Sequence, residues 1–315
     1  MNKLQGAIFS IPMFFKKDKS IDFISLKNYI SKCLDNPGVD VIYAMSYNTR
    51  LRQLNFEEIV EVSKLCCELA NSFGKKAIVG HPYTITNDEF HNYCQIVKEF
   101  NPFAISVLYP ERYYAINQPL VDFYSVPKNS GLKVLVHEQK LVSGFDGSLI
   151  DWPDNLIIEV FKDDNIIAVK EDSKNDIITK KILELSEKSD LNIIVAGGGK
   201  IRARKLIKEA NLKCWLNGSL MLFPEITDKI VNAYLNDDKN LIEWYEKNIE
   251  IPYFDLLIKK VGWHIGHKAA LHFLGYCELE ERAPMPQMST EDFNSFKPLL
   301  EELKSKARNI FNNKY

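Results

Sequence analysis

The chain has 315 residues, of which 46% are hydrophobic and 26% are charged. This composition can build an ordinary globular core, and the length allows one large domain or two smaller ones. The formal net charge of -2 argues against the clustered basic surface that nucleic-acid binding requires.

The amino-terminal segment and the cysteines give an expectation about the compartment. The apolar stretch in residues 1–19 is too short to cross a membrane, is interrupted by Pro12, and lacks a clear small-residue cleavage site. The six cysteines form no C-x-x-C pair, which is typical of reduced thiols. We therefore expect a cytoplasmic protein that has neither a membrane nor a nucleic acid as a partner.

Short apolar runs alternate with helical patterns along roughly the first 220 residues. We predict helices at 21–34 and at 55–73, the latter with Asn55 as its N-cap, and a third that begins near Thr86. The helical pattern is weakest after Asp151. The runs predicted as strands are 6–11, 39–45, 76–80, 103–108, 132–137, 166–170, 192–196 and 214–218.

Eight strand–helix units predict a (β/α)8 barrel, and nearly unbroken apolar strands are typical of a sheet that is buried on both faces. A doubly wound open sheet is the alternative. Residues 239–315 are helical in pattern and rich in Glu and Lys, and no Pro-, Gly- or Ser-rich linker precedes them. We therefore predict a barrel over 1–238 that carries the active site, with 239–315 as a helical extension packed on it.

Active-site groups of such barrels lie at the carboxyl-terminal ends of the strands. In this chain those ends are followed by polar, aromatic or glycine-rich segments at 46–50, 109–114, 137–138, 170–172, 197–200 and 217–219.

Lys170 ends the apolar sixth strand. A partly desolvated amine there would be held neutral, and a neutral amine attacks carbonyl groups. The alternative is a solvated lysine that pairs with Glu171 or Asp172.

His137 ends the neighbouring fifth strand. Adjacent strands lie about 5 Å apart, so an imidazole there could transfer protons to groups on the sixth strand. The alternative is a histidine that is satisfied by local backbone hydrogen bonds.

The remaining candidates are less specific. The glycine-rich loop 197–200 could hold a carboxylate or phosphate on its backbone amides, or it could be a simple tight turn. His264, His267 and His272 have helical spacing, but no carboxylate or cysteine completes a metal site at a suggestive distance. We interpret Cys66 and Cys67 as core residues. A final group of aromatic residues belongs either to the core or to a pocket wall: Phe14, Phe15, Tyr113 and Tyr114.

The sequence resembles the dihydrodipicolinate synthase / N-acetylneuraminate lyase family over nearly its whole length. Residues 166–173, IIAVKEDS, are similar to the segment that carries the family's Schiff-base lysine. Residues 54–58 resemble its Leu-Ser-x-Glu-Glu helix start, and 132–144 align without gaps to its fifth-strand segment. Near the carboxyl terminus, 267–271, Gly275 and 282–284 resemble its Lys-x-Ala-Leu, Gly and Arg-x-Pro signature.

The departures from the family are equally informative. Its Gly-Thr-Thr-Gly-Glu loop is replaced by 46–50, in which Asn48 and backbone amides could hold a carboxylate and Arg50 reverses the usual charge. At the position of the family's proton-relaying tyrosine, on the fifth strand, this chain has His137. At the position of the arginine that contacts the second substrate carboxylate, this chain has Val142. The family's fourth-strand tyrosine aligns with Arg112 or, after a small shift, with Tyr113.

The resemblance implies a class I aldolase-type lyase that condenses or cleaves a pyruvate-type 2-keto acid and an aldehyde. It implies a covalent lysine imine in place of a cofactor, no metal, and a homodimer or homotetramer. The aldehyde could be sugar-derived, and the alternatives are a 4-hydroxy-tetrahydrodipicolinate synthase and a catalytically silent barrel. The predicted catalytic residues are Lys170, His137, Tyr113 and Tyr109, and the predicted substrate-binding residues are Tyr47, Asn48, Arg112, Gly198, Gly199 and Asn217.

Overall fold

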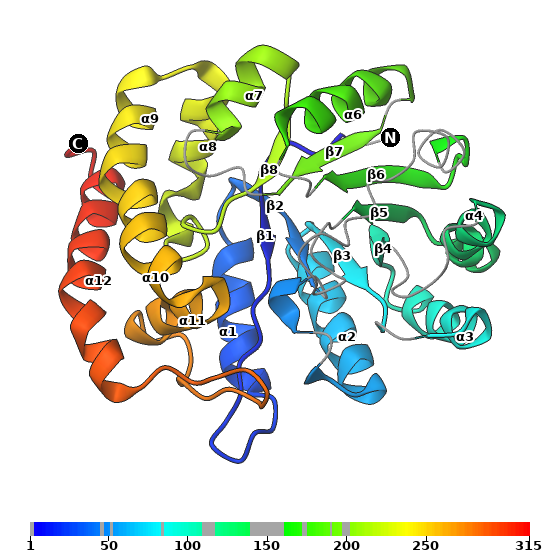
Figure 1. Ribbon diagram of the computed structural model, residues 1–315, viewed down its shortest axis with the longest axis horizontal. Coiled ribbons are helices and arrows are strands. Elements are labelled where there is room, and N and C mark those ends of the chain that lie inside the picture. Colours follow the sequence, from blue (N-terminus) through cyan, green and yellow to red (C-terminus); the bar gives the residue numbers. More distant parts are fainter. Residues whose placement is uncertain are drawn as a thin grey trace.

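The computed structural model describes residues 3–44, 47–50, 53–82, 85–108, 117–138, 161–171, 175–189, 191–196 and 202–315. Eight parallel strands close into a barrel in chain order, with the first strand paired to the last (Figure 1). The barrel prediction is confirmed, and the open-sheet alternative is wrong. The strands are β1 Gly6–Ser10, β2 Val39–Tyr43, β3 Lys76–Gly80, β4 Ala104–Leu108, β5 Val134–Glu138, β6 Ile166–Glu171, β7 Asn192–Val195 and β8 Cys214–Leu216.

Helices follow the strands and form the outer ring of the barrel (Figure 1). Two begin with complete capping boxes: Asn55 with Glu58, and Thr86 with Glu89, which satisfy the unpaired amides of the first turn. In the part of the chain that the structure describes, the helices of this ring are α1 Phe23–Leu34, α2 Phe56–Ser72, α3 Asn87–Lys98, α4 Asn117–Ser125, α6 Asp176–Ser189, α7 Arg202–Ala210 and α8 Thr227–Asn236, with short 3₁₀ turns η1 Tyr47–Thr49, η3 Val126–Ser130 and η4 Pro224–Ile226.

The strands are buried on both faces, so the core has two layers. The outer layer joins strands to helices. The inner layer fills the barrel with mostly aliphatic side chains, as expected for a barrel that is packed and not a pore. Its buried members are Leu4, Ile8, Val41, Tyr43, Ile78, Ala104, Leu135, Ile167, Ala168, Ile194 and Cys214. Tyr43 stands out because it carries a polar group into this apolar interior.

The chain after α8 is mostly helical, and it gathers on one flank of the barrel beside α8 (Figure 1). Lys229 of α8 donates to the carbonyls of Ile310 and Phe311 at 3.1 and 2.8 Å. The division of the chain at residue 238 stays a prediction. The elements here are α9 Lys239–Tyr245, the π-helical segments η5 Glu246–Glu250 and η6 Tyr253–Ile258, α10 Lys259–Val261, α11 Trp263–Phe273 and α12 Thr290–Phe311.

Several predicted strands are longer than the observed ones. The second ends at Tyr43 and the eighth at Leu216, whereas the predicted strands extend to 45 and 218. Ala44 and Asn217, just beyond these two ends, are still buried, so burial continues past the hydrogen-bonded ladder. Within the described ranges, no helix is both long and apolar enough to cross a membrane.

Candidate active site

Lys170 lies near the end of β6 with its side chain withdrawn from solvent. Only 3% of the residue is exposed, and its Nζ lies 2.6 Å from Nε2 of His137. The solvated-lysine interpretation is therefore wrong, since the amine faces the barrel and meets an imidazole.

His137 is fully buried and is the direct neighbour of Lys170 in the β5–β6 register. Its Nδ1 lies 3.2 Å from the hydroxyl of Tyr43, which in turn lies 2.5 Å from Oγ of Ser106. Both ring nitrogens therefore have side-chain partners, which replaces the interpretation of a histidine satisfied by local backbone bonds. A connected polar chain runs from β4 through β2 and β5 to the amine on β6.

Glu171, the residue after Lys170, points to the opposite face of the strand, as alternation requires. Its carboxylate accepts hydrogen bonds from Thr179 of α6 and from Arg202 of α7, the latter at 3.5 Å. Arg202 also donates to the carbonyl of Ala196 at 2.7 Å. This cluster fixes the end of β6 against two helices and the end of β7, and so holds the backbone that carries Lys170.

The η1 turn after β2 forms hydrogen bonds with the segment at the end of β1 and with the first residue of α11. Asn48 accepts from the indole Nε1 of Trp263 and lies with its amide 3.5 Å from the carbonyl of Ser10. Thr49 donates to the carbonyl of Ile11 at 2.6 Å. The turn thus joins the end of β1 to α11, over the side of the barrel where the strands end.

Arg50, which reverses the charge found in the family, forms a two-pronged ion pair with Glu281. The two hydrogen bonds measure 3.1 and 3.0 Å, and both residues are buried. Burial raises the pKa of the Glu281 carboxyl, while the charges of Lys268 and Arg50 oppose that rise. The guanidinium therefore already holds a carboxylate of the chain itself.

Asn217, expected to bind substrate, is 1% exposed and belongs to a buried network. Its oxygen accepts from Ser219 at 3.0 Å, from the backbone of Leu220 at 3.1 Å and from Tyr245 at 3.2 Å. Its amide donates to Glu250 at 3.1 Å. The geometry supports a structural role that joins β8 to the carboxyl-terminal helices, and it gives no support to the expected substrate contact.

Several predicted site residues lie outside the described residues: Tyr109, Arg112, Tyr113, Gly198 and Gly199, together with the side chain of Tyr47. Their roles stay predictions. Tyr114 and Val142 lie outside the described residues as well.

Two histidines of α11, His267 and His272, have partners other than a metal. Nδ1 of His267 lies 2.7 Å from the hydroxyl of Tyr253, and its ring stacks on Trp263. Burial lowers the pKa of His267 to about 3, with a smaller contribution from the charge of Arg50. His272 donates from Nδ1 to the carbonyl of Cys277 at 2.7 Å. Among the described residues, no group of three or more potential ligands is arranged to hold a metal ion.

Two of the open aromatic assignments and the cysteine pair fall in the core. Phe14 and Phe15 are fully buried and flank the amine of Lys268, at 5.4 and 5.5 Å from their ring centres. Cys66 and Cys67 are fully buried as well. Burial raises the pKa of the Cys67 thiol to about 12, which keeps it protonated and unreactive.

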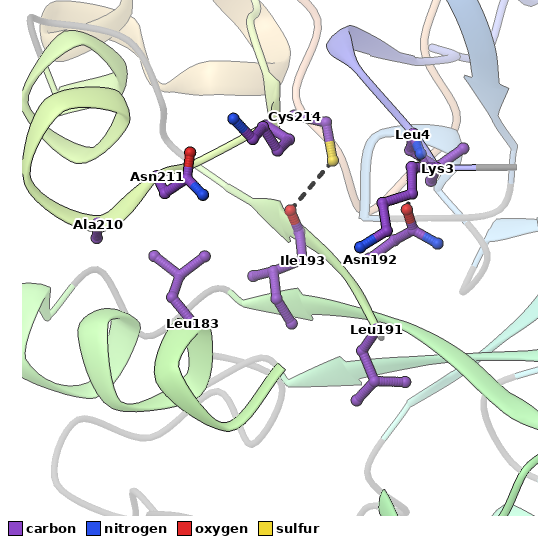
Figure 2. A pocket seen from close by; sticks show the side chains of 10 residues that line it. Lys3, Leu4, Leu183, Leu191, Asn192, Ile193, Ala210, Asn211 and Cys214 are labelled. Carbon is purple, nitrogen blue, oxygen red and sulfur yellow. Dashed lines mark hydrogen bonds between the residues drawn. The ribbon is translucent and has the colours of Figure 1, made fainter. Parts of the chain in front are cut away.

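A small cavity of about 120 Å³ lies at the end of the barrel where the strands begin, opposite to the end that carries Lys170 (Figure 2). Asn192 and Cys214, which begin β7 and β8, form part of its wall together with Leu183 of α6. Lys170 lies toward the other end of its strand, so this cavity is separate from the candidate active site.

Two residues of the polar chain, Tyr43 and Ser106, were not predicted from the sequence. Tyr43 occurs two positions after Val41, and period-two alternation places both on the interior face. A polar residue on that face is the signal that could have identified it. Ser106, in the middle of a buried strand, offers the same signal.

Comparisons with known proteins bear on the fold. No protein-family model matches the sequence, and no curated protein matches it. Structures do match. The 4-hydroxy-tetrahydrodipicolinate synthase from Methylacidiphilum fumariolicum SolV is 17% identical with a TM-score of 0.81, over 98% of this chain and 99% of that chain.

Two further structures show the same correspondence. The dihydrodipicolinate synthase from Bacteroides thetaiotaomicron is 19% identical with a TM-score of 0.82, over 96% of this chain and 100% of that one. The N-acetylneuraminate lyase from Fusobacterium nucleatum is 16% identical with a TM-score of 0.75, over 97% and 98%.

The fold and the site together define a (β/α)8 barrel with carboxyl-terminal helices and a buried lysine near the end of its sixth strand. Structures of both dihydrodipicolinate synthases and N-acetylneuraminate lyases share this fold across the full chain. At 16–19% identity these matches concern the fold.

Proposed function

We propose that this protein is a class I aldolase-type lyase in which Lys170 forms a Schiff base with a pyruvate-type 2-keto acid. The observation that carries the proposal is the buried Lys170 amine, 3% exposed and 2.6 Å from an imidazole nitrogen. An amine that is withdrawn from water beside a proton acceptor can become a neutral nucleophile. The same fold in Schiff-base aldolases supports the assignment.

The proton steps follow from the Lys170–His137 pair. Nε2 of His137 takes a proton from the Lys170 ammonium, and the free amine then attacks the keto carbon of the acid. The imidazolium returns that proton to the hydroxyl of the resulting carbinolamine, which leaves as water and gives the imine. Neutral His137 then takes a C3 proton from the iminium, which gives the enamine. C3 of the enamine attacks the aldehyde carbon while the imidazolium protonates the aldehyde oxygen, and water hydrolyses the resulting iminium to release the product and the free Lys170 amine. Cleavage follows the same steps in reverse.

The substrate carboxylate would be held by the η1 turn, with Asn48 and backbone amides as donors. Arg50 is engaged by Glu281, and the position of the family's carboxylate-binding arginine is Val142. Neither position therefore offers the bidentate partner that would recognise a second carboxylate. This favours an aldehyde without a carboxylate, such as a sugar-derived one, over the substrate of a 4-hydroxy-tetrahydrodipicolinate synthase.

The first test is borohydride trapping with pyruvate, followed by peptide mass mapping. We expect the reduced adduct on Lys170 in the parent and complete loss of it in Lys170→Ala, with the circular dichroism spectrum unchanged. Lys180→Ala, which removes a lysine on the outer surface of α6, is the matched control and should be trapped as the parent is.

An adduct on a peptide that lacks Lys170 would refute the assignment, and no adduct in the parent would indicate a catalytically silent barrel. Turnover of aspartate semialdehyde by a trapped enzyme would establish the 4-hydroxy-tetrahydrodipicolinate synthase alternative.

A further inference from the structure

The hydroxyl of Tyr43 lies in the barrel interior between two polar side chains. Tyr43 is fully buried and Ser106 is 2% exposed. The hydroxyl lies 2.5 Å from Ser106 Oγ and 3.2 Å from Nδ1 of His137. Most of the other side chains that fill the interior are aliphatic, so a hydroxyl there is costly unless it is hydrogen-bonded.

We propose that Tyr43 and Ser106 are positioning residues, which hold the ring of His137 so that Nε2 faces the Lys170 amine. The proposal rests on the proposed function for its kinetic consequences, and on geometry alone for the arrangement of the ring. Neither residue needs to touch the substrate, because both act through His137.

The orientation of the ring depends on the Tyr43 hydroxyl. Turning the imidazole by 180° about Cβ–Cγ would place carbon atoms where Nδ1 and Nε2 now meet Tyr43 and Lys170. The hydrogen bond at Nδ1 disfavours that turn, and therefore keeps a nitrogen 2.6 Å from the amine.

The hydroxyl also matches both states that His137 must adopt. When Nε2 accepts a proton from Lys170, the ring carries a proton on each nitrogen, and Nδ1 donates to the Tyr43 oxygen. In the neutral ring that accepts this proton, Nε2 is unprotonated and Nδ1 carries the hydrogen, so Nδ1 donates to the same Tyr43 oxygen. The Tyr43 O–H can then donate to Oγ of Ser106, which completes the chain.

Kinetics separate a positioning role from a purely structural one. We expect Tyr43→Phe to lower kcat about 10-fold to 100-fold, because a buried nitrogen loses a partner, with KM changed only a few-fold and trapping at Lys170 retained. In a His137→Ala background the same substitution should have almost no further effect, because Tyr43 acts through the imidazole. Ser106→Ala should lower kcat less than Tyr43→Phe does, and Ser106→Thr, which keeps the hydroxyl, should restore it.

Tyr29→Phe is the matched control. It also removes a buried hydroxyl hydrogen bond, from Tyr29 to the carbonyl of Met221 at 2.8 Å, and it should leave kcat unchanged. Parent-like kcat in Tyr43→Phe would overturn the proposal. An equal loss in the parent and in the His137→Ala background would also overturn it, since Tyr43 would then act independently of the imidazole.

Nitrogen NMR tests the arrangement without any turnover. The chain has six histidines, and the His137 signals of ¹⁵N-histidine-labelled protein can be assigned by their absence in His137→Ala. We expect the Nδ1 resonance to move in Tyr43→Phe and to stay in Tyr29→Phe. An unmoved resonance would refute the positioning role even if pyruvate is trapped. A moved resonance in a protein that never traps pyruvate would reject the proposed function and retain the arrangement.

Discussion

At the scale of single residues, two neighbouring positions of β6 carry opposite tasks. Lys170 faces the interior and meets His137 at 2.6 Å, whereas Glu171 faces the helices and is held by Thr179 and Arg202. Alternation along the strand keeps the carboxylate away from the amine. Lys170 is therefore paired with a group that can exchange protons with it.

His137 should be the proton-transfer group of the reaction. General acid–base groups contribute about 10²–10⁴-fold, so His137→Ala should lower kcat by about that factor while trapping at Lys170 stays detectable. We also expect an acidic limb in the pH–rate profile that disappears in His137→Tyr, because free imidazole titrates near pH 6.5 and phenol near pH 10. Steady-state kinetics across pH would measure both effects.

The control for this prediction is His91→Ala, on the surface of α3, which should leave turnover unchanged. If His137→Ala retains turnover within a few-fold of the parent, the proton-transfer role belongs to another group, and the fourth-strand residues Tyr109 and Tyr113 are then the candidates.

At the scale of elements, the end of β8 meets the start of α11. A Cβ atom placed on Gly218 would lie 2.0 Å from Cη2 and 2.6 Å from Cζ3 of Trp263. The same indole donates to Asn48. The absence of a side chain at 218 therefore lets the carboxyl-terminal helices approach the barrel and hold the η1 turn.

Gly218→Ala should lower the free energy of unfolding by about 1–3 kcal/mol, the usual cost of adding a methyl group to packed atoms. Trp263→Phe in the same chain should recover part of that loss, because the smaller ring leaves room for the methyl group. Urea denaturation of the two single variants and the double variant would measure the coupling. Strictly additive losses would show that the indole is not what excludes the side chain.

At the scale of the whole molecule, buried neutral histidines make the fold sensitive to acid. His81 donates from Nδ1 to the carbonyl of Pro82 at 2.6 Å and accepts at Nε2 from the amide of Leu108 at 3.1 Å. Burial lowers its pKa to about 4, and burial lowers the pKa of His267 to about 3. Both rings fit their surroundings in the neutral form.

The free energy of unfolding should therefore fall as the pH drops from about 6.5 toward 4. The unfolded chain binds protons on these histidines in that window and the folded chain does not, so the stabilisation is complete above pH 6.5 and is lost as the pH falls. The raised pKa of Glu281 acts in the opposite direction, so the test is a difference between variants. His267→Gln should have a shallower slope than the parent, and an identical slope would contradict the assignment.

The barrel could be predicted from local sequence patterns. Strands of a closed parallel barrel are buried on both faces, so each appears as an apolar run, and the helix starts at Asn55 and Thr86 are set by their own capping residues. The lysine near the end of the sixth run follows from the same local pattern. Exact strand ends were less predictable, because burial at the mouth extends beyond the hydrogen-bonded ladder.

The contacts that those residues make could not be predicted in this way, because they join segments that are distant in the chain. Tyr43 and His137 are 94 positions apart, and Arg50 and Glu281 are 231 positions apart. Asn217, which the sequence places at the mouth, is drawn into a buried network with Tyr245 and Glu250 by the way the carboxyl-terminal helices pack. Strand register and helix packing set these pairings, and both depend on contacts between segments that no local pattern encodes.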